Sequence, residues 1–122
     1  MIVDSNILID FLKGKPEAVD FIAQFEPILT SVVAVSELYA GIISKKELRD
    51  LNAFIESSVE QIPITVEIAK EAGLLRMKLG KSHGIRLPDA FIAATAINQK
   101  VPVASLDKKH FSVLTDNLIV PY

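Results

Sequence analysis

The sequence predicts an α/β fold with a mainly parallel sheet. Short apolar segments alternate along the chain with stretches in which apolar residues recur at helical spacing. Parallel neighbours in a sheet need a crossover connection, and the crossover is usually helical, so this alternation favours parallel pairing. The chain has 122 residues, which suits one domain, residues 1–122, with a substantial core. We therefore expect about five strands flanked by helices.

Strands are predicted where short apolar runs lie between turn signals and helix-capping residues. Met1 to Asp4 is such a run, and Asp4 therefore stands at a junction between a strand and a helix. The predicted strands cover residues 1–4, 27–30, 59–64, 101–105 and 118–120.

Helices are predicted from apolar spacing together with residues that favour helix ends. Pro16 and Pro88 suit a first turn, because the missing N–H has no partner there. Ser31 and Thr65 are plausible N-caps, and Ser44 with Glu47 matches a capping box. The predicted helices cover residues 6–12, a segment opened by Pro16 with Ala18, Ile22 and Phe25 on one face, 32–42, 45–57, 66–80 and a segment from Pro88 to about Lys100. Residues 81–86 are predicted as a polar loop and 107–111 as a charged turn.

Composition excludes several classes of protein. The chain has no cysteine, so disulfides and thiolate metal sites are absent. The apolar runs are too short for a membrane span, and the first residues lack a secretory signal, so we expect a soluble cytoplasmic protein. The net charge of −2 argues against coating nucleic acid by bulk charge, but it leaves room for a local patch or a bound cation.

Four acidic residues occur in unusually apolar surroundings. Asp4 ends an apolar strand, Glu37 is the only charge in an apolar helix, Asp89 begins an apolar helix and Asp107 follows an apolar strand. Most of the other acids lie on ordinary polar helix faces, with Asp10 intermediate. In open parallel sheets, sites form beyond the carboxyl ends of strands, where Asp4 and Asp107 are expected.

Convergence of these four acids would require a cation. Two carboxylates about 5 Å apart repel by ~3 kcal/mol at an effective dielectric of 20, so six pairs approach ~20 kcal/mol. A domain is stable by only ~5–15 kcal/mol. Oxygen ligands without cysteine or a paired-histidine motif favour Mg²⁺ or Mn²⁺, which suit phosphoryl chemistry. His83 and His110 lack metal-motif spacing and are interpreted as a loop residue and a surface or phosphate-near residue.

Four segments of the chain resemble the motifs of PIN-domain ribonucleases, most closely the VapC-type toxins. The segments are Val3 to Leu8, Val35 to Leu38, Leu87 to Ala94 and Ser105 to Phe111, in the family's order along the whole chain. The resemblance implies a three-layer fold and a metal-dependent endoribonuclease. In that family's pattern, Asp4, Glu37, Asp89 and Asp107 would be the catalytic metal ligands. Asn6 would orient Asp4, and Ser105 would line the pocket.

The last motif departs from the commoner family pattern. The family often has Asn where this chain has Asp107, and an Asp before the final Phe where this chain has His110. Ser5 also replaces the commoner Thr but keeps the hydroxyl. The resemblance to toxins further implies a cognate antitoxin, whose segment packs over the acidic groove, and a homodimer.

Three functions remain open from the residues. The first is an endoribonuclease that hydrolyses RNA with metal-activated water, with Lys13, Arg86, Lys108 and Lys109 available to attract phosphates. The second is an inactive module of the same fold that binds RNA or protein. The third is a phosphoryl-transfer enzyme with Asp4 as covalent nucleophile, although that role usually involves an Asp-x-Asp pair and this chain has Asp4-Ser5-Asn6.

Overall fold

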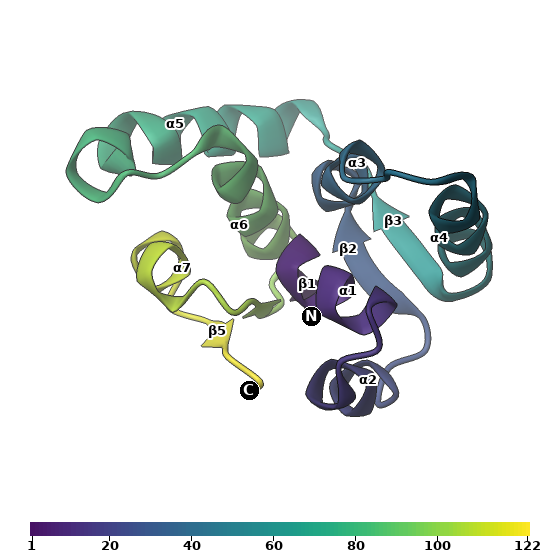
Figure 1. Cartoon of the computed structure of the whole chain (residues 1–122). Helices are drawn as coiled ribbons and strands as arrows, with labels where there is room; N and C mark the ends of the chain where they lie inside the picture. The colour runs from purple at the N-terminus through teal and green to yellow at the C-terminus, as the bar shows by residue number, and fades with distance from the viewer.

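The computed structural model describes every residue from Met1 to Tyr122. Helices surround a small central set of strands (Figure 1). In chain order the elements are β1 (Ile2–Val3), α1 (Ser5–Leu12), α2 (Pro16–Ile22), β2 (Ile28–Ser31), α3 (Val32–Ala40), α4 (Lys45–Ser58), β3 (Val59–Ile62), α5 (Val66–His83), α6 (Leu87–Gln99), β4 (Val103–Ala104), α7 (Lys108–Leu114) and β5 (Leu118–Ile119).

All strand pairs are parallel, as predicted. One group has the order β1-β4-β5, and β2 pairs with β3 in a second group. The two groups meet where the buried Thr30 hydroxyl of β2 donates a hydrogen bond of 2.7 Å to the carbonyl oxygen of Val3 in β1. The α/β fold with about five strands is therefore confirmed. The carboxyl ends of β1 and β4 lie side by side, because Val3 pairs with Ala104.

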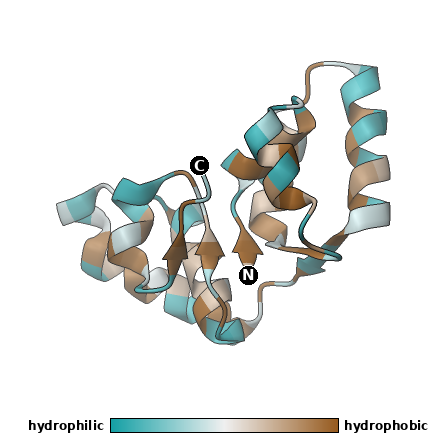
Figure 2. Cartoon of the chain, turned by 90° about the horizontal axis from the view of Figure 1, so that it is seen from below, coloured by the Kyte–Doolittle hydropathy of each residue, from teal (hydrophilic) through white to brown (hydrophobic).

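Residues that alternate along β1 and β4 contact two different helical layers. Ile2 and Val103 are buried in a cluster with α5, α6 and α7. Val3 and Ala104, one position further on, are buried in a second cluster with α1, α2, α3 and α4. Successive side chains of a strand point to opposite faces, so the strands form the middle of three layers. Figure 2 shows three neighbouring strands as hydrophobic and the helices as mixed along their length.

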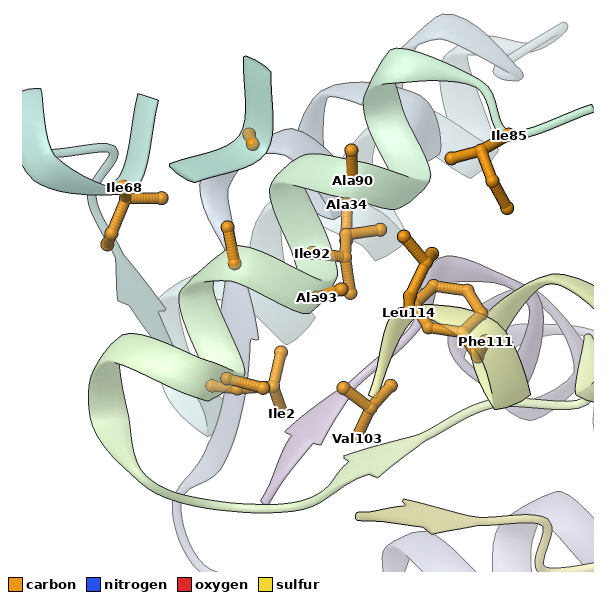
Figure 3. Close-up of a cluster of buried hydrophobic side chains, with 13 residues drawn as sticks. Ile2, Ala34, Ile68, Ile85, Ala90, Ile92, Ala93, Val103, Phe111 and Leu114 are labelled. Carbon is orange, nitrogen blue, oxygen red and sulfur yellow. The ribbon is translucent and has the colours of Figure 1, made fainter. Parts of the chain in front are cut away.

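Helix α6 is the centre of the first cluster. Its small side chains Ala90, Ala93, Ala94 and Ala96 are almost fully buried, which allows close packing against α5. Figure 3 shows Ile2 and Val103 near α6, with Phe111 and Leu114 of α7 beside them. The burial of α6 on most sides fixes the position of any side chain in its first turn.

Two helix ends differ from the prediction. Helix α5 continues through Gly80 to His83 and ends at Gly84, whose φ of +65° is left-handed. A glycine inside a helix costs only about 1 kcal/mol relative to alanine, so Gly80 does not end the helix. The predicted loop at residues 81–86 is therefore helical in its first half. Helix α2 ends at Ile22, so Phe25 lies beyond it, although Phe25 still packs on the second cluster.

The predicted charged turn at residues 107–111 is instead the start of helix α7. Asp107 is the N-cap, and its carboxylate accepts a hydrogen bond from the backbone N–H of His110. Phe111 and Leu114, three residues apart, bury one face of this short helix. The prediction failed because a single apolar pair gives little periodicity in the sequence.

Other caps agree with the prediction. The Ser31, Ser44 and Thr65 side chains accept backbone N–H hydrogen bonds at the starts of α3, α4 and α5. Glu47 accepts from the N–H of Ile43 and closes the first turn of α4. None of the helices has the length and apolar character needed to cross a membrane.

Candidate metal and active site

The candidate site lies beyond the carboxyl ends of β1 and β4. Asp4 follows β1 and is the N-cap of α1, with its carboxylate accepting the N–H of Ser5 at 2.7 Å. Ser105 follows β4 and donates its hydroxyl to the other carboxylate oxygen of Asp4 at 2.6 Å. The parallel pairing of β1 with β4 brings these two residues together, although they are far apart in the sequence.

Burial changes the acidity of Asp4. The residue is only 4% exposed. Burial raises the pKa of Asp4 to about 6; the Ser105 and Ser5 hydrogen bonds oppose the shift, and the negative charges of Asp89 and Glu37 add to it. A carboxylate in this state gains from a nearby cation, because a cation offsets both the lost hydration and the like-charge repulsion.

Asn6 acts on Asp4 only through Ser105. Its side-chain amide donates to the Ser105 hydroxyl at 3.3 Å, and its amide oxygen accepts the N–H of Leu106 at 3.3 Å. The N–H of Asp107 also donates to Ser105, at 3.0 Å. The side chain of Asn6 therefore holds Ser105, and Ser105 in turn holds the Asp4 carboxylate.

Glu37 approaches Asp4 from helix α3. The Ser5 hydroxyl donates to the Glu37 carboxylate at 3.2 Å and lies 3.5 Å from the Asp4 carboxylate, so it connects the two acids. The other Glu37 oxygen lies 3.9 Å from the Arg86 guanidinium.

Asp89 lies in the first turn of α6 and is 5% exposed. Its only polar side-chain contact within the chain is the Arg86 guanidinium at 3.7 Å. Burial raises the pKa of Asp89, Arg86 lowers it, and the charges of Asp107 and Glu37 raise it further. Arg86 therefore stands between Glu37 and Asp89 as a positive charge in an otherwise acidic site.

Helix α7 adds Asp107 and His110 to the site. The His110 Nδ1 atom lies 2.7 Å from an Asp107 carboxylate oxygen. One ligand atom from each of Asp89, Asp107 and His110 lies within 4.8 Å of the others. His110 was not predicted as a site residue. The signal that could have found it is its position three residues after Asp107, which places both side chains on one face once α7 is a helix.

The structure therefore brings the predicted acids into one region as two linked groups. Asp4 and Glu37 share the Ser5 hydroxyl, and Asp89 and Asp107 lie together with His110. Asp10 lies outside the site, where its carboxylate accepts a hydrogen bond from the Tyr122 hydroxyl at 3.0 Å.

A groove of about 370 Å³ begins beside Glu37. It lies between α1, α3 and α4, and half of its lining is apolar. Its lining residues are Ile9, Leu12, Lys13, Glu37, Leu38, Gly41, Ile42, Glu47, Asp50 and Leu51. The acidic site is therefore continuous with an open and partly apolar surface.

These features define an α/β domain with carboxylates grouped at the ends of two parallel strands. The PIN domain model matches residues 1–116, and the chain belongs to the PIN domain family. It is 34% identical over 126 residues to Ribonuclease VapC19 of Mycobacterium tuberculosis, with 99% of this chain and 98% of the relative covered. It is 36% identical over 115 residues to Ribonuclease VapC10 of the same species, with coverage of 91% and 85%.

A solved toxin-antitoxin complex from Klebsiella pneumoniae contains a similar chain. The TM-score is 0.80 at 29% identity, with 99% of this chain and 97% of the other covered. The predicted resemblance to PIN-domain ribonucleases of the VapC type is therefore confirmed.

Proposed function

We propose that this chain is a metal-dependent endoribonuclease and the toxin of a toxin–antitoxin pair. The observation that carries the proposal is the grouping of Asp4, Glu37, Asp89 and Asp107, from four separate parts of the chain, at one end of the parallel strands. Membership of the PIN family and the relatives named ribonucleases supply the reaction and the substrate class.

The donor set fits a hard divalent cation. Asp4, Glu37, Asp89 and Asp107 offer carboxylate oxygens, the ligands that Mg²⁺ and Mn²⁺ prefer. Burial, together with the neighbouring acids, raises the pKa values of Asp4 and Asp89, so a bound cation would favour the charged forms of both carboxylates. When bound, such a cation would polarise the scissile phosphate and make a water molecule more acidic.

The chain's own residues have separate tasks in this proposal. Ser105 and the N–H of Ser5 hold the Asp4 carboxylate in one orientation, and Asn6 holds Ser105. The buried α6 helix fixes Asp89. Arg86, whose side chain is 67% exposed, can turn from the acids toward an RNA phosphate.

We propose an antitoxin as the protein partner and a homodimer as the state of the chain. The structural relative from Klebsiella pneumoniae belongs to a toxin-antitoxin complex. The groove beside Glu37 has apolar walls and an acidic end, so it suits an amphipathic segment that carries a positive charge.

The alternatives explain the site less well. An inactive binding module has no need for buried acids that repel one another, and the curated relatives are named ribonucleases. Covalent phosphoryl transfer to Asp4 usually involves an Asp-x-Asp pair, and this chain has Asp4-Ser5-Asn6 instead.

Cleavage of RNA tests the proposal. We expect purified protein to cut single-stranded RNA with Mg²⁺ or Mn²⁺, and Asp4→Asn or Asp89→Asn to lower the rate by at least about 100-fold, as expected when one charge-stabilising group is removed. Asp20→Asn, at an exposed site on α2, is the matched control and should cut normally. Normal cutting by either site variant would refute the proposed site; no cutting by the wild type would refute the function.

A further inference from the structure

His110 stands among the acids of the site and has no assigned role there. One of its ring nitrogens lies within 4.8 Å of a carboxylate oxygen of Asp89 and one of Asp107. The Nδ1 atom is 2.7 Å from Asp107. This is the distance of a hydrogen bond within the chain, so a cation between the two groups would take the place of the proton that they share.

The fold holds the histidine in this place. The next residue, Phe111, is fully buried in the first core cluster, and Leu114 anchors the same face of α7 (Figure 3). Asp107 caps the helix by accepting the N–H of His110. The position of His110 is therefore set by core packing and by a helix cap.

Asp89 supplies an independent indication that a ligand belongs here. Its side chain is 8% exposed and accepts no hydrogen bond from the chain, and the Arg86 guanidinium at 3.7 Å is its only polar side-chain partner. The exposed Arg86 guanidinium is a charged partner, but at 3.7 Å it leaves the Asp89 carboxylate without a hydrogen-bond donor, which is costly for a buried charge. The side chains beside Asp89 that carry possible metal-ligand atoms are those of Asp107 and His110.

We infer that His110 is a nitrogen ligand of the cation held by Asp89 and Asp107, and that it makes this site prefer Mn²⁺ over Mg²⁺. The inference rests on the proposed function, because it concerns the same cation. Imidazole is a softer ligand than carboxylate; Mg²⁺ favours oxygen ligands, and transition metals accept nitrogen more readily. A site made of carboxylates alone would discriminate less between the two ions.

Calorimetric titration of the purified chain with Mn²⁺ and with Mg²⁺ tests the preference. Loss of a group that only hydrogen-bonds to a metal ligand costs about 10- to 100-fold in affinity, so loss of a direct ligand in His110→Asn should weaken Mn²⁺ binding by at least about 10-fold. We expect a much smaller change for Mg²⁺. His110→Asp replaces nitrogen with oxygen and should narrow the Mn²⁺/Mg²⁺ ratio. His83→Asn is the matched control, because His83 is exposed at the end of α5, and should leave both affinities unchanged.

Pulsed electron paramagnetic resonance of bound Mn²⁺ gives a direct readout. We expect a nitrogen hyperfine coupling that persists in His83→Asn and disappears in His110→Asn and His110→Asp. Circular dichroism checks that the variants fold. Mn²⁺ bound without nitrogen coupling, or equal losses of Mn²⁺ and Mg²⁺ affinity in His110→Asn, would overturn the inference.

The metal-binding experiments, read together with the RNA cleavage assay, separate this inference from the proposed function. Nitrogen-coupled Mn²⁺ in a protein that does not cut RNA would refute the nuclease and leave the ligand in place. RNA cutting with Mn²⁺ bound only by oxygen would leave the nuclease in place and refute the role of His110. A wild-type chain that binds neither ion would refute both.

Discussion

Asp4 combines burial, two hydrogen bonds and two nearby negative charges. The hydrogen bonds from Ser5 and Ser105 favour its charged form, but burial outweighs them and its pKa rises to about 6. Burial likewise raises the pKa of Asp89, where the charge of Arg86 opposes the shift. At the scale of residues, burial makes the charged forms of these acids costly to the fold, and a bound cation would offset that cost.

The first prediction is a loss of stability as the pH rises. The pKa of Asp4 is about 6 in the folded chain against 3.8 as its ordinary value, so the folded state binds the proton more tightly. Its contribution is fully present below about pH 4 and is lost as the pH rises through 6. The difference of roughly two pKa units corresponds to at most about 3 kcal/mol.

Urea unfolding in a chelator between pH 4 and 7 measures this effect. The free energy of unfolding should fall more steeply with pH in the wild type than in Asp4→Asn. The amide in Asp4→Asn can change hydrogen bonds, but that change shifts the free energy of unfolding by the same amount at every pH. The slope of the free energy of unfolding against pH therefore decides the comparison. Asp20→Asn should follow the wild type, and parallel curves for the wild type and Asp4→Asn would contradict the prediction.

At the scale of elements, helix α5 contains one glycine in its interior and ends at another, and the two glycines have different effects on the stability of the helix. Gly73 lies inside the helix with open space where a Cβ would be, and Gly84 ends the helix at a φ of +65°. The connection from Gly84 leads directly to Ile85 and Arg86, so the end of α5 also helps to place Arg86 beside the acids.

The second prediction is that alanine has opposite effects at these two glycines. Gly73→Ala should raise the free energy of unfolding by about 0.5–1 kcal/mol, because alanine loses less backbone entropy in a helix. Gly84→Ala should lower it by about 1–2 kcal/mol, because the left-handed conformation strains a side chain. Urea unfolding of both variants measures the difference, and stabilisation by Gly84→Ala would contradict the assigned helix end.

Elements of this chain could be predicted where periodicity or a cap was strong. Ser31, Ser44 and Thr65 cap the helices expected of them. Helix α7 was missed, since one turn with a single apolar pair looks like a charged loop until the core it packs on is known. The extension of α5 was missed because Gly80 is a possible end, while Gly84 is the real one.

At the scale of the whole molecule, the site joins the two helical layers. Glu37 comes from α3, Asp89 from α6 and Asp107 from the start of α7, and the strand ends carry Asp4. Repulsion among these acids acts between elements that must stay together in the fold. A bound cation should therefore stabilise the entire chain.

The third prediction is that Mn²⁺ raises the unfolding temperature. A ligand at 100 times its Kd stabilises the folded state by about 2.7 kcal/mol. For a chain of this length that corresponds to a rise of roughly 10 °C, and chelator should reverse it. Thermal denaturation with and without Mn²⁺ measures the rise, which Asp89→Asn should abolish and Asp20→Asn should retain. A rise of equal size in Asp89→Asn would place the cation elsewhere.

The sequence by itself determined the class of fold, the order of most elements and the four unusual acids. Those features are local: they depend on spacing, caps and single charges in apolar surroundings. Only the tertiary structure decided that Asn6 acts through Ser105, that Arg86 stands between Glu37 and Asp89, and that His110 joins Asp89 and Asp107. These contacts depend on how α3, α6 and α7 pack around β1 and β4, and packing between distant segments leaves no periodic pattern in the sequence.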